Sequence, residues 1–432
     1  MKISLPGPRF MAATILAVGT LFSPLLISES HSSSTAVDEQ APSFTTSKFP
    51  GEQSLGSIQI AADGQQIAAI WTRSFQGAKE VRVVSSINGG ISFSEPSTVW
   101  SGSEGAGGVQ IAVSGSTIAA LWQVFLPDDG SDVFLARSID GGITFSAPTN
   151  VSRSPETATN LNPTMFFNGS NITVMWGEND GYDGIHSATS FDGGLTFDEP
   201  LLLSGRPNGR VVGPMFEMGP ANTFFAAWAW EEAGNTGIEF TRSTNGGLSF
   251  ETPNDVLPGQ CCTRTLLSHA GKVYLQSARR LIGSEDGGLT WNSLYPGIES
   301  LSSTAQSDYL YVNGVDWDED TTSYSVQVSS SGDGGATFHH HELGILNAQC
   351  SWGVYTSAVG ETATTSWYET DPETSGCSPL DIRNLVLRTT KDNGNSYGQP
   401  VKFPVSGSGE LGSTVFSDPK RIAVVWTSYA ND

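Results

Sequence analysis

The sequence predicts an all-β protein made of repeated four-stranded antiparallel sheets. Of its 432 residues, 49 are glycine and only 15% are charged, which is typical of strands joined by tight turns. A short turn motif recurs along the chain, and an apolar, strand-like segment precedes each copy. No segment carries a sustained helical period of about 3.6 residues, so a helical repeat protein is excluded.

The turn motif is an octapeptide, seen clearly in Ser138–Phe145 as SIDGGITF. Its third residue is Asp or Asn, glycine follows, and an aromatic residue ends it. Successive copies are 41 to 59 residues apart, and repetition at such a period is the signature of a repeat architecture. The third positions of the seven copies are Asn88, Asp140, Asp192, Asn245, Asp286, Asp333 and Asp392.

The second repeated element is an apolar pentapeptide upstream of the turn, first seen as IAAIW at Ile67–Trp71. Short apolar runs bounded by Gly and Asp turns indicate buried strands. The repeated tryptophan suggests a core position between units. Further copies, some weaker, are Ile118–Trp122, Ile172–Trp176, Phe224–Trp228, Val273–Ser277, Leu310–Gly314, Ala363–Trp367 and Ile422–Trp426.

Each unit divides into four antiparallel strands, so the chain predicts a β-propeller. There are eight strand pairs but seven turns, because the chain ends soon after the last pair. The segment 43–50 (SFTTSKFP) resembles the region before Pro404 (YGQPVKFP) and can supply the missing outer strand. We therefore expect eight blades, with the ring closed by N- and C-terminal strands. A seven-bladed ring or a truncated chain is the alternative.

The N-terminal region predicts export. Lys2 and Arg9 precede the apolar run Met11–Ile27, so residues 1–30 are interpreted as a signal peptide or an uncleaved anchor. Residues 31–42 form a polar linker, and residues 43–432 form a single propeller domain. We expect a secreted or cell-surface, extracytoplasmic monomer with no membrane span once the signal is removed.

The net charge limits the classes of binding partner, and the cysteines suggest disulfide bonds. The formal net charge of −23 repels phosphate backbones and anionic membranes, which argues against nucleic acid as a partner. Four cysteines in an exported protein can pair. Cys350 with Cys377 is the preferred disulfide, whereas Cys261 and Cys262 form either a vicinal pair or bonds elsewhere. No CxxC or His spacing indicates a metal site.

The turn motif resembles the Asp box, or bacterial neuraminidase (BNR) repeat, of sialidases and related propellers. The resemblance covers essentially the whole predicted domain, and it implies that the box joins the third and fourth strands on the rim away from the catalytic face. Asn and Asp side chains can accept hydrogen bonds from nearby backbone amides, and glycine supplies positive φ. Asn88 and Asn245 replace the acid, so a structural role is predicted.

Function is expected where the copies differ, on the face opposite the boxes. The residue two positions after the repeated tryptophan opens onto that face, although strand ends also simply reach solvent. Across the units it is Arg73, Val124, Glu178, Trp230, Arg279, Asp316, Glu369 and Ser428. Nearby loops add Arg206, Arg210, Arg264, Arg280 and Trp317. Sugar-binding faces combine aromatic rings with planar polar groups, so we predict a glycan or another extracellular ligand.

The sialidase resemblance implies cleavage of a terminal sialic acid by three arginines, a Tyr nucleophile with a Glu partner and an Asp acid/base. The candidate catalytic residues are Tyr368, Glu369, Asp316 and Glu178. The candidate ligand-binding residues are Arg73, Arg264, Arg279, Arg280, Trp230 and Trp317. The Arg-Ile-Pro signature of many sialidases is absent, which favours binding over catalysis and keeps exo-acting sialidase-type hydrolysis as the alternative. No cofactor is required, although the acidic loops could hold Ca²⁺.

Overall fold

A computed structural model describes most of the chain. The described residues are 14–20, 43–49, 58–127, 130–155, 158–168, 170–179, 183–206, 209–269, 271–277, 280–295, 300–306, 309–318, 323–346, 354–359, 361–370, 382–404, 413–418 and 421–427. Within these ranges no helix is long and apolar enough to cross a bilayer.

The described strands form eight four-stranded sheets, and all strand pairs in them are antiparallel. Sheet 1 contains β3 (Ile58–Asp63), β4 (Gln66–Phe75), β5 (Ala78–Ser86) and β6 (Ser97–Gly102). Sheet 2 contains β7 (Gly105–Ser114), β8 (Thr117–Phe125), β9 (Ser131–Ser138) and β10 (Thr149–Asn150). Sheet 3 contains β11 (Thr159–Asn168), β12 (Asn171–Asn179), β13 (Asp183–Ser190) and β14 (Leu201–Arg206).

Sheet 4 contains β15 (Gly209–Met218), β16 (Phe224–Glu232), β17 (Asn235–Ser243) and β18 (Asn254–Asp255), with a 3₁₀ turn at Pro220–Asn222. Sheet 5 contains β19 (Thr263–His269), β20 (Lys272–Ser277), β21 (Leu281–Ser284) and β22 (Asn292–Leu294). Sheet 6 contains β23 (Ser300–Gln306), β24 (Tyr309–Asp318), β25 (Ser323–Ser331) and β26 (His339–Leu346). Sheet 7 contains β27 (Tyr355–Val359), β28 (Thr362–Thr370), β29 (Ile382–Thr390) and β30 (Val401–Pro404).

The remaining sheet, the terminal sheet, joins both ends of the chain. Its strand order is β2-β1-β32-β31, with β31 at Ser413–Asp418, β32 at Arg421–Thr427 and β2 at Ser43–Phe49. The outer strand therefore falls in the segment that the sequence analysis assigned to it. The third strand, β1 (Thr14–Thr20), was not expected there, because its apolar run was assigned to the export signal. A run rich in apolar and β-branched residues suits both roles.

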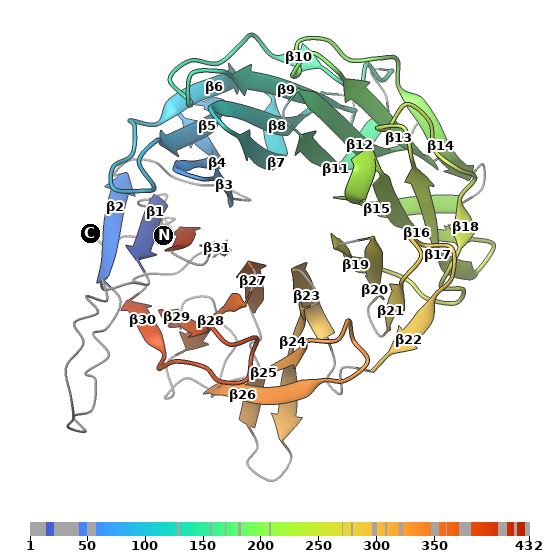
Figure 1. The fold of residues 1–432 in the computed structure, drawn as a ribbon. Coiled ribbons are helices and arrows are strands. Elements are labelled where there is room, and N and C mark those ends of the chain that lie inside the picture. Colours follow the sequence, from blue (N-terminus) through green and yellow to red (C-terminus); the bar gives the residue numbers. More distant parts are fainter. Residues whose placement is uncertain are drawn as a thin grey trace, which may run out of the picture.

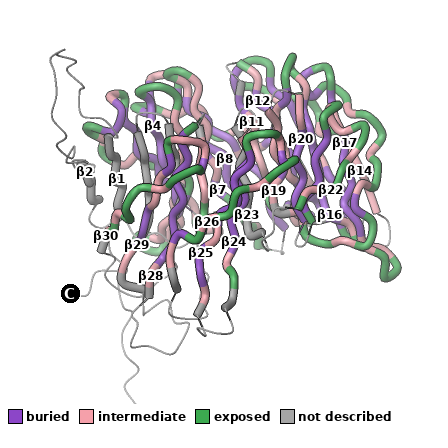
Figure 2. The backbone as a smooth tube through the Cα atoms, turned by 60° about the horizontal axis from the view of Figure 1, so that its bottom comes forward, coloured by how far each residue is buried: buried purple, intermediate pink, exposed green. Residues whose placement is uncertain are grey.

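The sheets stand side by side around a common centre, in a propeller-like arrangement (Figure 1). The first strand of each sheet lies nearest the centre. Consecutive first strands contact one another, and β31 of the terminal sheet contacts both β27 and β3. Figure 2 shows that buried residues run along the strands, whereas the connecting turns are exposed.

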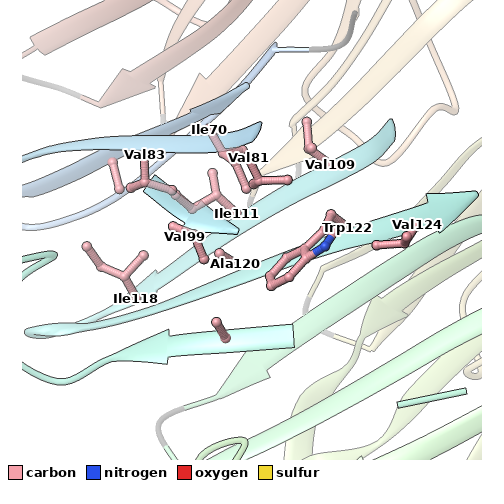
Figure 3. Close-up of a cluster of buried hydrophobic side chains, with 12 residues drawn as sticks. Ile70, Val81, Val83, Val99, Val109, Ile111, Ile118, Ala120, Trp122 and Val124 are labelled. Atoms are coloured by element: carbon pink, nitrogen blue, oxygen red, sulfur yellow. The ribbon is translucent and has the colours of Figure 1, made fainter. Parts of the chain in front are cut away.

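The core lies between neighbouring sheets rather than within any one of them. In the cluster between sheets 1 and 2, Trp122 is fully buried among Val81, Val109 and Ile111 (Figure 3). The expectation that the repeated tryptophan is a core residue is confirmed at five positions, each at most 2% exposed: Trp71, Trp122, Trp176, Trp228 and Trp367. The side chain of Trp426 lies outside the described residues.

One ionisable residue of the first strand of sheet 4 has a pKa that burial shifts strongly. Glu217 lies on β15, on the same side of the strand as Met215, which packs between sheets 4 and 5. Burial raises the pKa of Glu217 from 4.5 to about 7.

We therefore expect the pH to change stability through Glu217. Because its pKa is higher in the folded state than in the unfolded chain, its contribution is complete below pH 4.5 and is lost as the pH rises through about 7. Between pH 5 and 8 the wild type should lose about 1 to 3 kcal/mol in the free energy of unfolding through this group. The Glu217→Gln variant should not show this loss. Urea unfolding of both proteins between pH 5 and 8 measures the free energy of unfolding. The control is exposed Glu95→Gln, and parallel pH curves for Glu217→Gln and wild type would contradict the assignment.

Candidate functional site

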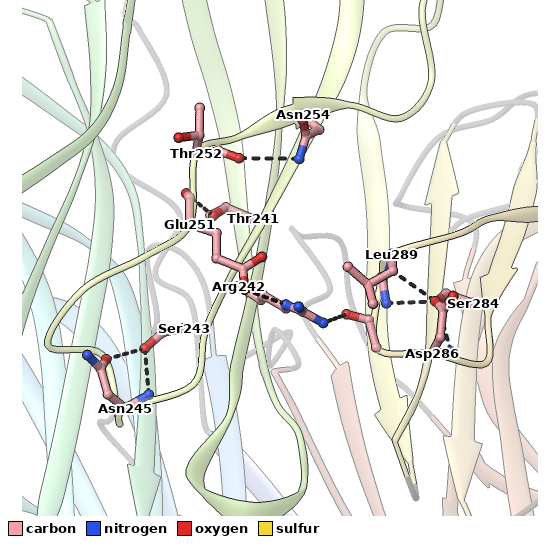
Figure 4. Close-up of polar contacts among 12 residues, drawn as sticks. Thr241, Arg242, Ser243, Asn245, Glu251, Thr252, Asn254, Ser284, Asp286 and Leu289 are labelled. Carbon is pink, nitrogen blue, oxygen red and sulfur yellow. Dashed lines mark hydrogen bonds and ion pairs between the residues drawn. The ribbon is translucent and has the colours of Figure 1, made fainter.

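The seven repeated turns share one hydrogen-bond arrangement. In the turn of sheet 2, Ser138 Oγ donates to Asp140 Oδ1 (2.7 Å) and accepts from the Gly142 amide (2.8 Å). Asp140 Oδ1 accepts from the Thr144 amide (3.0 Å), and Thr144 Oγ1 donates to Asp140 Oδ2 (2.6 Å). The two glycines have φ of +76° and +93°, which side chains rarely tolerate. Figure 4 shows two further copies, at Asn245 and Asp286.

The Asn copies keep the turn with one bond reversed. Asn88 Oδ1 accepts from the Ser92 amide (3.0 Å), whereas its Nδ2 donates to Ser92 Oγ (2.8 Å). In the Asp copies the hydroxyl donates instead, and this bond is the main reason why the pKa of Asp140 falls to about 2. The carboxylate oxygens are thus occupied by the turn itself.

The strand register separates two faces of the molecule. Ser138, at the start of the turn, lies opposite Ile118 at the beginning of β8, whereas Ser131 lies opposite Phe125 at its far end. The end that carries the repeated turns is called the turn face. The end that carries the connections between second and third strands is called the loop face, and the variable residues of the sequence analysis lie there.

One of the candidate arginines and one candidate acid are already occupied. Arg73 Nε donates to Glu80 Oε2 (2.6 Å), and the guanidinium lies 4.7 Å from the centre of the Phe75 ring. Glu178 is only 8% exposed, and it accepts hydrogen bonds from Trp176 Nε1 (3.3 Å) and from a serine hydroxyl. The Arg73 charge is thus compensated by Glu80, and the Glu178 carboxylate already has neutral hydrogen-bond donors, so both side chains are engaged within the protein.

Arg206 is the centre of a cluster between sheets 3 and 4. Its guanidinium lies 4.3 Å from the centre of the Trp230 ring, and it forms ion pairs with Glu232 (3.2 Å) and Glu239. Glu239 also accepts from Trp228 Nε1 (2.7 Å). The sequence analysis named Arg206 and Trp230 but missed both glutamates. The available signal was the register, because Glu239 lies directly opposite Trp228.

Asp255 adds a further acid beside this cluster. Partial burial raises the pKa of Asp255, and the nearby Glu239 carboxylate adds to the rise. A Cβ built at Gly237 would lie 2.6 Å from Trp230 Nε1 and 2.7 Å from Asp255 Oδ2, so both groups meet over this glycine. One guanidinium therefore faces several carboxylates, which leaves the cluster with no excess positive charge.

The proposed nucleophile pair does not converge. Tyr368 is 2% exposed within β28, whereas Glu369 is part-exposed and its carboxylate forms an ion pair with Lys402 Nζ (2.7 Å). Adjacent residues of a strand point to opposite sides, so these two side chains diverge. Asp316 is exposed near the end of β24. Arg279 and the side chains of Arg264 and Trp317 lie outside the described part of the chain.

Two arginines of sheets 4 and 5 differ from the paired ones. Arg210, at the start of β15, and Arg280, just before β21, are exposed on the loop face. Neither forms an ion pair with any carboxylate in the described ranges. The innermost strands of these sheets are joined by Thr263 Oγ1, which donates to the Gly213 carbonyl (2.7 Å). Arg264 follows Thr263, at the bulge of β19.

The loop that carries Arg280 is tightly closed. The Ser277 amide donates to the Arg280 carbonyl (2.8 Å), and the Arg280 amide donates to Ser277 Oγ (3.0 Å). The backbone under the guanidinium is thus fixed at both ends of the loop. Sheets 4 and 5 therefore place at least two arginines without a direct ion pair to a described carboxylate on one face of an acidic protein, although Glu231 lies opposite Arg210 in the strand register.

The structure tests the prediction for Cys261 and Cys262 but not the one for Cys350 and Cys377. Cys261 is an exposed free thiol, so the vicinal alternative with Cys262 is wrong for this structure. Adjacent cysteines rarely meet disulfide geometry without strain. Cys350 and Cys377 lie outside the described residues, so their pairing stays a prediction. In the described ranges, no group of three or more His, Cys, Asp or Glu residues could hold a metal ion.

The sequence matches no protein-family model and no curated protein. Its structure is similar to that of the polysaccharide lyase Uly1, with a TM-score of 0.53, 8% identity, and coverage of 88% of this chain and 93% of that chain. The two chains share a fold. Weaker similarities are to the Hadza microbial sialidase Hz136 (TM-score 0.42, 11% identity, 98% of this chain and 89% of that chain) and to the α-L-arabinofuranosidase Arb93A from Fusarium graminearum (TM-score 0.42, 11% identity, 64% and 92%).

The turn geometry makes a test at Asp140 specific. Asp140→Ala should lower the thermal unfolding midpoint at pH 7, whereas Asp140→Asn should keep most of the stability because Asn makes the same turn elsewhere in the chain. The pKa is lower in the folded state, so the carboxylate's contribution is lost as the pH falls from 3.8 towards about 2. The Asn variant should lack this acid sensitivity. Equal melting of the Ala and Asn variants at pH 7 would contradict a turn-holding role.

Proposed function

We propose that this protein is an eight-bladed, sialidase-like β-propeller that binds carbohydrates through its loop face. The terminal sheet contacts the sheets on both of its sides, which supports a ring closed by the two chain ends. The arrangement of the seven turns supports the assignment of Asp boxes with a structural role. The fold shared with a polysaccharide lyase is consistent with a carbohydrate ligand.

The ligand we propose carries a carboxylate, as uronic and sialic acids do. The observation that carries this proposal is the pair of exposed arginines, Arg210 and Arg280, on neighbouring sheets. A guanidinium binds a carboxylate through two parallel hydrogen bonds, and neither of these two forms an ion pair with a carboxylate of the described residues. Arg264 and Arg279, close by in sequence, are proposed to complete the group.

The other candidate residues are assigned supporting roles. Glu80 and Glu232 hold Arg73 and Arg206 in place, so these arginines order the loop face instead of clamping a ligand. Trp230, with Arg206 over its ring, is proposed to border the binding surface. No cofactor is required in this proposal, and Ca²⁺ at the acidic loops stays a prediction.

The protein is further proposed to act outside the cytoplasm as a monomer. The N-terminal apolar run and its preceding basic residues support export, and the disulfide predicted between Cys350 and Cys377 would form there. Strand β1 lies within this run, so removal of a signal peptide would also remove the third strand of the terminal sheet. An uncleaved N-terminus would keep this strand.

Carboxylate recognition can be tested by calorimetry with oligogalacturonides and sialyllactose, and with lactose as the neutral comparison. We expect the acidic sugars to bind and each of Arg210→Ala and Arg280→Ala to weaken binding about 10- to 100-fold. Arg153→Ala is the charge-matched control, because the Arg153 guanidinium pairs with Glu199 and donates to the Phe197 carbonyl of sheet 3 and is not part of sheets 4 and 5. Equal effects of all three variants, or lactose binding that Arg210→Ala and Arg280→Ala weaken as much as they weaken binding of the acidic sugars, would overturn the proposal.

Sialidase-type hydrolysis is the alternative, and the turn motif is its support. A buried Tyr368 and a Glu369 held by Lys402 are unsuited to attack on a sugar, so we expect no release from a fluorogenic sialoside. Release that Tyr368→Phe abolishes would show that the protein is an enzyme. Release that persists in this variant would place the chemistry on other residues and equally contradict binding alone.

A further inference from the structure

A separate pocket lies on the turn-face side of the molecule, between the outer part of sheet 4 and the turn of sheet 5. Its volume is about 420 Å³, within the range of roughly 300–1,000 Å³ that is usual for small-molecule sites. Its lining includes Arg242, Glu251, Thr252, Asn254, Asp255 and Trp291. None of these residues belongs to the pair Arg210 and Arg280, although Asp255 also lies beside the Arg206 cluster.

The pocket lies beside the outer strand of sheet 4, which is very short. Strand β18 has two residues and pairs only with Glu239 and Phe240 of β17. The next residues of β17 are held by the incoming chain instead, since the Glu251 amide donates to the Arg242 carbonyl (2.9 Å) and Thr241 Oγ1 donates to the Glu251 carbonyl (2.6 Å). The chain between Glu251 and β18 therefore passes outside β17 and leaves a space beside it.

One wall of the pocket is an indole that is fixed in position. Trp291 Nε1 donates to the Gly288 carbonyl (3.1 Å), and the ring meets Phe240 edge-on, with centroids 5.0 Å apart and an angle of 80°. The indole is part-exposed. Trp291 ends the turn motif of sheet 5, and it is the one tryptophan among the seven copies, whose other members are Phe93, Phe145, Phe197, Phe250, Phe338 and Tyr397.

The polar side of the pocket is also fixed. Arg242 Nε donates to Glu251 Oε1 (2.9 Å), and Arg242 Nη1 donates to the Gly287 carbonyl of the next sheet (3.3 Å), as Figure 4 shows. The guanidinium therefore orients the Glu251 carboxylate and links sheets 4 and 5. Asn254 Nδ2 donates to the Thr252 carbonyl (3.3 Å), which places an amide at the rim.

The charges select the ligand class. Arg242 is compensated by Glu251, and Asp255 adds a second acid, so a carboxylate or phosphate would be repelled. The pocket then offers a ligand an aromatic ring together with carboxylate, amide and hydroxyl groups. An apolar sugar face can stack on the indole while its hydroxyls bond to these groups.

We propose that this pocket binds a neutral sugar, as a second carbohydrate site distinct from the loop face. The site does not depend on the carboxylate recognition proposed above. A protein with both sites would hold a glycan at two places that differ in charge preference, acidic sugar on the loop face and neutral sugar at the pocket.

The test uses the full chain and four neutral trisaccharides: xylotriose, cellotriose, mannotriose and arabinotriose. By calorimetry we expect at least one to bind with millimolar affinity or better. Trp291→Phe should weaken that binding about tenfold, because the smaller ring loses stacking area. Glu251→Ser should weaken it as well. Both replacements occur at the matching positions of sheet 2, Phe145 and Ser146, so the fold should persist, and circular dichroism melting checks this.

The combined variant Arg210→Ala, Arg280→Ala separates the two sites. It should leave neutral-sugar binding unchanged even if the loop-face proposal fails. The pocket proposal is overturned if none of the trisaccharides binds the wild type. It is equally overturned if folded Trp291→Phe and Glu251→Ser proteins bind like wild type, or if the loop-face variant abolishes the binding.

Discussion

The burial of each sheet's faces against its neighbours is the constraint on which the rest of the structure depends. A four-stranded sheet has two faces, and in this protein the clusters that bury them combine residues of adjacent sheets, as Trp122 of sheet 2 does with Val81 and Val83 of sheet 1. Most clusters in the described part of the chain draw on two neighbouring sheets. A sheet at an open end would expose a tryptophan-rich face to water, which would cost several kcal/mol for each large side chain. The contacts of the terminal sheet with both neighbours follow from the same requirement.

The turn face stabilises this arrangement locally. Each turn satisfies its own polar groups through one serine or threonine hydroxyl and one carboxylate or amide, so it needs nothing from the next sheet. Additional bonds nevertheless cross between sheets, such as Arg137 Nη1 to the Asp192 carbonyl (3.0 Å) and Arg242 Nη1 to the Gly287 carbonyl (3.3 Å). The turn face is therefore rigid and repetitive, and the pocket beside Trp291 arises where one copy departs from the pattern.

The loop face differs from the turn face in its charged side chains. There, most of the conspicuous charges are compensated, Arg73 by Glu80, Arg206 by Glu232, and Glu369 by Lys402. Compensation orders long side chains at modest net gain in stability and leaves them unsuited to a charged ligand. Arg210 and Arg280 stand out because they are exposed on a protein of net charge −23. The acidic-sugar proposal thus rests on two arginines that differ from the paired ones. The neutral-sugar proposal rests on the one turn motif that ends in tryptophan.

The sequence by itself determined the repeating sheets, the position of each turn and the burial of the repeated tryptophan, because these features depend on local hydrogen bonding and on hydrophobic periodicity. It also placed segment 43–50 as the outer strand of the terminal sheet, although β2 pairs there with β1 and not with the C-terminal strands. Only the tertiary structure decided which charges are compensated, since Glu239 meets Arg206 through packing between sheets 3 and 4. The divergence of Tyr368 and Glu369 likewise required their placement on one strand, with one residue buried and the other paired. Partners far apart in sequence leave no local pattern, so the pocket beside Trp291 and the place of β1 in the terminal sheet could be found only in three dimensions.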